Sequence, residues 1–181
     1  MMRHAIGGTI VFVALARAAA ATTLLPADIG ELSRDAIAVA LGRVTSLDAR
    51  WTDDRRAIDT LVTLDVDTYL KGDLGRTLQF RVPGGQIGRL RSVTVGAPSF
   101  ALDQRVVVFL GSRGPSVPYV LGLGQGVFRV TRDGAGWLVT PPSIEPIAAR
   151  SAPIIRGDSA RRPVALVLFE QRVKALAGSV R

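Results

Sequence analysis

The stretch IDTLVTLDVDTYL, residues 58–70, decides the fold class of this chain. Apolar residues occupy even positions in it, and polar residues lie between them at odd positions. The apolar set is Ile58, Val62, Leu64, Val66 and Leu70, and the polar set is Asp59, Thr63, Asp65 and Asp67. A period of two is typical of a strand with one buried face and one solvated face. The stretch therefore predicts an amphipathic β-strand.

Further strand-like runs lie on both sides of this one. They cover residues 36–47, 77–82, 91–95, 104–110, 119–123, 127–131 and 137–140. The run QRVVVFL at 104–110 is continuously apolar, which predicts a strand covered on both faces. Gly42 predicts a bulge or a tight bend, and Asp133-Gly134 predicts a hairpin with a loop longer than two residues. Because no βαβ alternation occurs, we expect seven or eight strands in a small, closed or half-closed antiparallel barrel.

Helical patterns flank the strands. Residues 26–34 predict one or two helical turns that form the short N-terminal helix of a β-barrel domain at 22–140, and prolines predict an extended linker at 141–161. A C-terminal amphipathic helix is predicted at 162–178, packed on the barrel. Its apolar stripe is Leu166, Phe169, Val173 and Leu176. Pro163 is expected in its first turn, and Glu170 with Lys174 forms an i,i+4 pair in the favoured order.

The N-terminus has the pattern of a secretory signal peptide, expected at residues 1–21. A positive start is followed by an apolar run at 5–16 and a small-residue exit. Since a bilayer span needs roughly 20 apolar residues, we expect cleavage and no stable membrane span afterwards. The chain has no cysteine, so a lipid anchor and disulfides are excluded. The expected location is periplasmic or extracellular.

The charge balance favours anionic partners. The whole chain carries +8, and loss of Arg3 and Arg17 with the signal would lower this by two, to +6. Lysine occurs only at positions 71 and 174, so the arginine-rich usage also fits a bias in the coding DNA. The charges form no dense cluster, so we expect no nucleic acid. The expected partner is a protein or an anionic envelope ligand.

Most catalytic side chains are missing from the chain. The only histidine is His4, inside the expected signal peptide. Without His or Cys, the common nucleophilic mechanisms and zinc sites are excluded, and we expect no enzyme activity, cofactor or metal. One alternative is a carboxylate-based hydrolase of an envelope or extracellular polymer, with Asp65 and Asp67 roughly 7 Å apart on one strand face. A calcium site with oxygen ligands at Asp53, Asp54 or Asp59 is a further alternative, but these residues do not have the spacing of an EF-hand.

Several motifs resemble a family of exported bacterial proteins of unknown function. They lie between residues 32 and 130: AVALGRV (38–44), Val66 followed by YLKG (69–72), PGG with Gly88 (83–88), VGAPSF (95–100), RVVVFL (105–110) and GLGQGVF (122–128). More distantly, the order G-x-V, V-x-x-x-x-K-G and a strand ending in Phe-Leu is similar to tissue inhibitors of metalloproteinases and netrin modules. This resemblance implies an OB-like barrel with flanking helices. It does not carry over the inhibitory mechanism, which uses an N-terminal cysteine.

The stretch VPGGQIGRLRSVTVGAPSF, residues 82–100, is the candidate binding loop. Its glycines allow the backbone to turn and approach a ligand, and its amide and guanidinium groups can donate to carboxylate, phosphate or sulfate. The candidate binding residues are Gly84, Gly85, Gln86, Gly88, Arg89 and Arg91. A long hairpin connection with solvated arginines is the alternative. We expect a non-enzymatic binding or inhibitor-like module, with a structural part of an envelope assembly as a further alternative.

Overall fold

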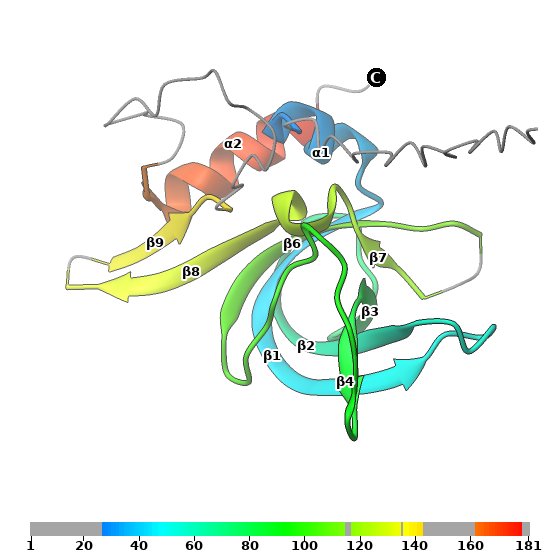
Figure 1. Cartoon of the computed structure of the whole chain (residues 1–181). Coiled ribbons are helices and arrows are strands. Elements are labelled where there is room, and N and C mark those ends of the chain that lie inside the picture. Colours follow the sequence, from blue (N-terminus) through cyan, green and yellow to red (C-terminus); the bar gives the residue numbers. More distant parts are fainter. Residues whose placement is uncertain (1–26, 115–116, 135, 143–161, 179–181) are drawn as a thin grey trace, which may run out of the picture.

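The structure, a computed structural model, describes residues 27–114, 117–134, 136–142 and 162–178 (Figure 1). The expected signal peptide and residues 143–161 of the expected linker lie outside these ranges. The elements in chain order are α1 (Ile29–Asp35), β1 (Ala38–Trp51), β2 (Ile58–Lys71), β3 (Thr77–Pro83), β4 (Gly85–Ile87), β5 (Leu90–Ser92), β6 (Arg105–Gly111), β7 (Tyr119–Val120), the 3-10 helix η1 (Leu123–Gly126), β8 (Val127–Asp133), β9 (Gly136–Thr140), β10 (Val164–Ala165) and α2 (Leu166–Gly178).

Five strands form a barrel-like ring in the order β1-β2-β3-β7-β6, with β6 pairing back to β1. The β3–β7 pair is parallel and the others are antiparallel. β6 pairs with β7 only through Leu110 and Gly111, and its first half pairs with β8 instead, so the ring is partly closed. β9 and β10 extend the sheet beyond the ring. The predicted class, a mainly β, OB-like barrel, is confirmed.

Two hydrophobic cores lie on the two faces of this sheet. In β6, Val106, Val108 and Leu110 belong to the core inside the barrel, whereas Val107 and Phe109 belong to the core beneath the helices. All five side chains have 0% exposure. The continuous apolar run at 104–110 is thus explained, because a strand between two cores has no solvated face.

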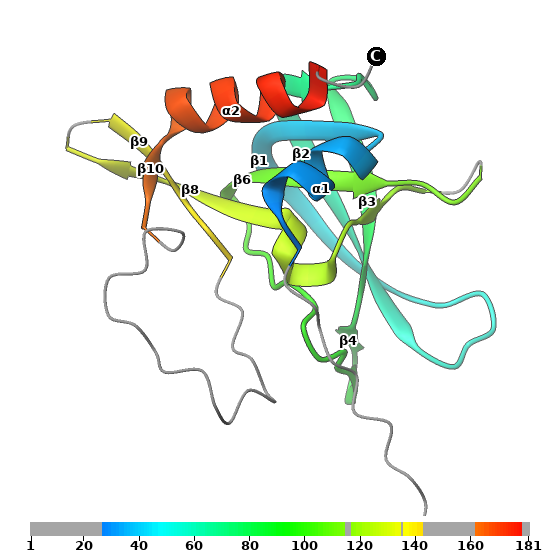
Figure 2. The same cartoon turned by 90° about the horizontal axis from the view of Figure 1, so that it is seen from above.

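The two helices cover one side of the barrel, and Figure 2 shows them from above. In α2 the predicted stripe faces the sheet. Phe169 and Val173 are buried, and the ring of Phe169 lies 4.9 Å from that of Phe128. Among the described residues, no helix has the length and apolar character needed to cross a membrane.

The start of α2 differs from the prediction. Pro163 is not in the first turn, because Val164–Ala165 forms β10 against β9 and the helix begins only at Leu166. Glu170 and Lys174 do not form the expected ion pair.

Other boundaries also needed correction. The strand expected at 91–95 is limited to Leu90–Ser92, and the strand expected at 119–123 ends at Val120. Asp133 pairs with Gly136, so the expected longer hairpin loop is wrong. The alternation in β2 is partial, since Leu61 and Thr63 are also buried. The bulge predicted at Gly42 is confirmed by a register shift between Leu41 and Gly42.

Candidate functional site

The candidate loop contains a small β-hairpin. β4 pairs with β5 through Gly85 and Ser92, Gln86 and Arg91, and Ile87 and Leu90. Gly88 and Arg89 form its two-residue turn, and Gly88 has a φ of 58°, a conformation that favours glycine. The hairpin projects from the barrel on the side opposite to the helices (Figure 1).

Hydrogen bonds fix the base of the hairpin to β2. The Gly84 N–H donates to the Ile58 carbonyl at 2.9 Å, and the Thr60 hydroxyl donates to the Gly84 carbonyl at 2.7 Å. A Cβ on Gly85 would lie 2.8 Å from Thr60 Oγ1 and 3.0 Å from a methyl carbon of Ile58. Glycine at position 85 therefore allows the base of the hairpin to pack closely against β2.

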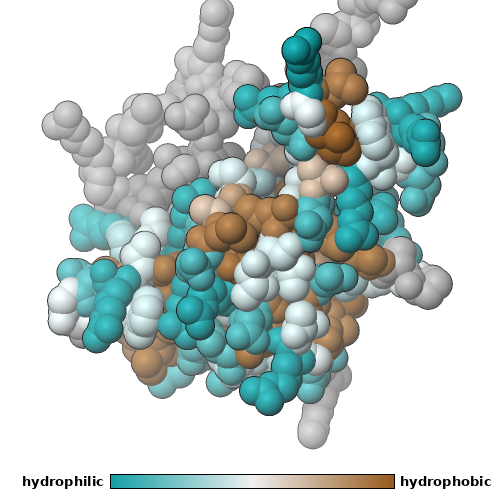
Figure 3. Space-filling model, turned by 90° about the horizontal axis from the view of Figure 1, so that it is seen from below, coloured by the Kyte–Doolittle hydropathy of each residue, from teal (hydrophilic) through white to brown (hydrophobic). Residues whose placement is uncertain are grey.

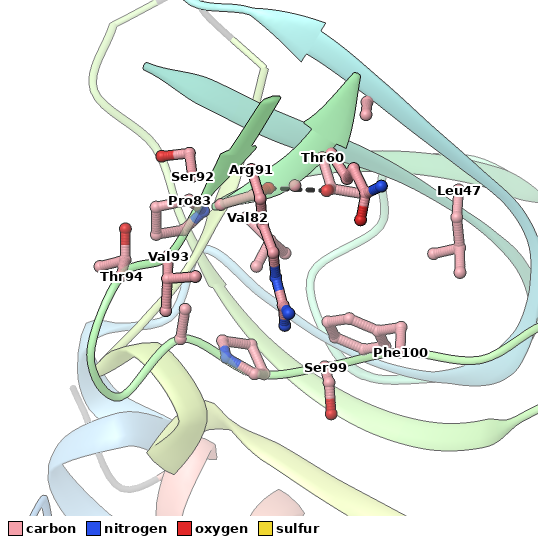
Figure 4. A pocket seen from close by; sticks show the side chains of 16 residues that line it. Leu47, Thr60, Val82, Pro83, Arg91, Ser92, Val93, Thr94, Ser99 and Phe100 are labelled. Carbon is pink, nitrogen blue, oxygen red and sulfur yellow. Dashed lines mark hydrogen bonds between the residues drawn. The ribbon is translucent and has the colours of Figure 1, made fainter. Parts of the chain in front are cut away.

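A groove of about 560 Å³, here called the first groove, lies between the hairpin and the segment that follows it (Figure 4). Barrel strands form part of its wall. The residues that line it are Leu47, Ala49, Thr60, Val82, Pro83, Gly84, Gly85, Gln86, Arg91, Ser92, Val93, Thr94, Ala97, Pro98, Ser99 and Phe100. Four of the six candidate residues therefore line the groove. Gly88 and Arg89, at the tip of the hairpin, do not.

Arg91 is the only charged residue among those that line the first groove. Its side chain extends from the hairpin into the groove, toward the segment that carries Ser99 and Phe100 (Figure 4). Among the residues that the structure describes, its guanidinium has no hydrogen-bond or ion-pair partner. Arg105 differs in this respect, because it pairs with Asp67 at 2.6 Å and stacks on Trp137 at 4.7 Å.

Apolar side chains surround the hairpin. Leu90, Val93 and Val95 are 59%, 71% and 68% exposed. Figure 3 views the protein from the side to which the hairpin projects, and apolar residues are interspersed with hydrophilic ones on this face. Residues 74–102 contain four arginines and no Asp or Glu. One of these, Arg81, pairs with Asp59 at 3.7 Å. An exposed apolar set beside the remaining arginines is typical of an interaction surface.

A second groove of about 400 Å³ adjoins the first. It is lined by Gly96, Ala97, Pro98, Ser99, Gly124, Val127, Arg129, Thr140, Pro141 and Pro142. Ala97, Pro98 and Ser99 line both grooves and form a ridge between them. Arg129 is the only charged residue that lines the second groove, and its Nη2 lies 3.4 Å from the Ser99 hydroxyl oxygen. Sequence reasoning missed this groove, because Arg129 and Ser99 are 30 positions apart.

The acidic candidates lie elsewhere. Asp65 and Asp67 are exposed and line neither groove, and Asp67 pairs with Arg105 at 2.6 Å. Burial raises the pKa of Asp59, although the attraction of Arg81 opposes this shift. The raised pKa disfavours the ionised carboxylate that a cation would need as its ligand. No group of three or more His, Cys, Asp or Glu side chains is placed to hold a metal ion in the described part of the chain.

No protein-family model, curated protein or solved structure matches this chain in the three comparisons. Fold and groove geometry alone therefore place it in a class: a mainly β, OB-like barrel with an arginine-bearing groove beside a projecting hairpin.

Proposed function

We propose that this chain is an exported, non-enzymatic binding module whose first groove receives an anionic group of a protein partner. One observation carries the proposal: Arg91 is the only charged residue of the groove, and its guanidinium has no partner among the described residues. A guanidinium beside apolar walls is more weakly screened than one in bulk water, and its planar donors match a carboxylate.

The composition of the groove supports binding over catalysis. The lining residues include hydroxyl groups, at Thr60, Ser92, Thr94 and Ser99, but no His, Cys, Asp, Glu or Lys that could act as a base. General acid–base or nucleophilic chemistry needs such a group within hydrogen-bond reach. Export of the protein rests on the signal-peptide pattern at residues 1–21.

The surroundings of the groove support a protein as the partner. Leu90, Val93 and Val95 expose apolar surface beside Arg91, and arginine next to apolar side chains is enriched at protein interfaces. The hairpin is held at its base by two hydrogen bonds, so little ordering is needed on binding. The resemblance to inhibitor and netrin modules is consistent with a binding role.

A pull-down with two charge reversals tests the proposal. The bait is the protein without residues 1–21, incubated with envelope and extracellular fractions of the producing organism. Arg91→Glu should lower capture of the partner by about tenfold or more, because attraction becomes repulsion in the groove. Arg89→Glu is the matched control, since it makes the same charge change on the same hairpin outside the groove. Equal loss with both variants would point to diffuse electrostatics and contradict the proposal.

A further inference from the structure

We infer that the partner presents one continuous acidic segment that crosses the ridge and places one carboxylate on Arg91 and a second on Arg129. The inference rests on the proposed function of the first groove and extends the site into the second. Each groove has a single charged residue, in both cases an arginine, and the two grooves share the wall made by Ala97, Pro98 and Ser99. A segment bound in one groove can therefore continue into the other across this ridge.

The ridge is held in place by the fold. The Gly96 carbonyl accepts a hydrogen bond from the Gly124 N–H at 2.8 Å, and the Ala97 N–H donates to the Thr94 carbonyl at 3.1 Å. A Cβ on Gly124 would lie 3.0 Å from the Gly96 carbonyl oxygen, so the ridge lies close against η1. Pro98 further restricts the backbone. The backbone between the two arginines is thus held by the fold, and a segment with two linked contacts across it gains from this preorganisation.

Arg129 is available for such a contact. Its side chain is exposed, and its hydrogen bond to the Ser99 hydroxyl, at 3.4 Å, is long. A carboxylate offers this guanidinium a shorter, charge-assisted bond. Neither groove contains an acidic residue that competes for the arginines.

The walls favour a peptide over a polyanionic nucleic acid or polysaccharide. Two single arginines are separated by Ala97 and Pro98, whereas a polyanion is bound by dense rows of positive charge. Val82, Val93 and Phe100 line the first groove and Val127 lines the second. These apolar residues can contact the side chains that flank the two acids. The predicted segment therefore has two acidic residues with small or apolar residues between and beside them.

Selection from a phage-displayed library of short random peptides tests the inference directly. The bait is the protein without residues 1–21, and the enriched peptides are synthesised for binding by fluorescence anisotropy. Enriched peptides should carry two acidic residues. Arg91→Gln and Arg129→Gln should each weaken binding by about tenfold, the effect of one charge-assisted hydrogen bond, and the double variant by about a hundredfold. Arg89→Gln should change it by less than about twofold.

Replacing each acid of the peptide by its amide tests the assignment further. One acid should couple to Arg91 and the other to Arg129 in double-mutant cycles. All three arginines are exposed, so unchanged thermal unfolding is expected for every variant.

The outcomes separate this inference from the proposed function. If only Arg91→Gln weakens binding, the two-groove segment is wrong and the proposed function stands. If neither variant weakens binding, both are wrong. If heparin binds more tightly than the enriched peptides and its binding depends on Arg91 and Arg129, the ligand is a polyanion and the inferred peptide segment is wrong. Self-association of the protein in sedimentation, lost in both variants, would identify a second copy as the occupant. If no peptide is enriched but capture in the pull-down still depends on Arg91, the inference of a two-groove acidic segment is wrong and the proposed function stands.

Discussion

At the scale of single residues, Gly42 shows how one missing Cβ shapes the barrel. It lies at a register shift of β1, in the strand that closes the ring with both β2 and β6. A Cβ at this position would lie 2.3 Å from the Asp65 carbonyl oxygen and 3.0 Å from the Val66 Cα. Both atoms belong to the backbone of a paired strand, so a side chain would force the two strands apart.

The substitution Gly42→Ala should therefore destabilise the protein. We expect the free energy of unfolding to fall by about 1–3 kcal/mol, the usual cost of overpacking, in urea denaturation followed by circular dichroism. Gly134→Ala is the matched control, since a Cβ there would contact nothing within 4 Å. An unchanged denaturation midpoint for Gly42→Ala would show that β1 can curl without the glycine.

At the scale of elements, the Lys71-Gly72 pair attaches helix α1 to the barrel. Lys71 Nζ donates to the Ser33 carbonyl at 2.9 Å and to the Arg34 carbonyl at 2.8 Å, in the last turn of α1. Gly72 has a φ of 64°, and a Cβ there would lie 2.3 Å from the Ile37 carbonyl oxygen. A helix of seven residues is not stable alone in water, so α1 depends on such tertiary contacts.

Lys71→Met should loosen α1 while retaining the apolar stem of the side chain. We expect the free energy of unfolding to fall by about 1–2 kcal/mol, since two carbonyls at the helix end lose a charged donor. Hydrogen exchange should become faster for the amide of Ala36, which donates to the Leu32 carbonyl. Lys174→Met, on an exposed site of α2, should change the stability by less than about 0.5 kcal/mol.

At the scale of the whole molecule, the two cores make the barrel and the helices interdependent. Leu32 of α1 and both Phe169 and Val173 of α2 share one core with Phe109 and Phe128 of the sheet. The apolar stripe of α2 is thus occupied by its own barrel. An assembly role that uses this stripe to dock on a partner would require the core to open.

Phe169→Ala should therefore weaken the whole domain and not only the C-terminus. We expect a loss of about 3–5 kcal/mol in the free energy of unfolding, measured by urea denaturation followed by circular dichroism. Leu168→Ala is the matched control, because Leu168 is the neighbouring helical residue and is 58% exposed. Deletion of residues 163–181 with an unchanged, cooperative transition of the barrel would contradict the shared core and favour the assembly role.

Periodicity located β2 and β6 because their side chains alternate between, or fill, two environments. It failed at residues 91–95, where Val93 and Val95 have strand-forming side chains yet lie exposed after β5 has ended. Pro163 is typical of the first turn of a helix, but the two residues after it, Val164 and Ala165, pair with β9 and form a strand. Contacts between distant segments override local propensity in both places.

The sequence by itself determined the long strands β2 and β6, the OB-like barrel class and the absence of His and Cys from residues 22–181, because these follow from residue type and spacing. It also identified Arg91 as a candidate binding residue within the glycine-rich stretch 82–100. Only the tertiary structure decided which arginine is free to bind. Arg105 meets Asp67 from 38 positions away, whereas Arg91 faces a groove without an acid. An ion pair depends on distance in space, and the fold alone sets that distance.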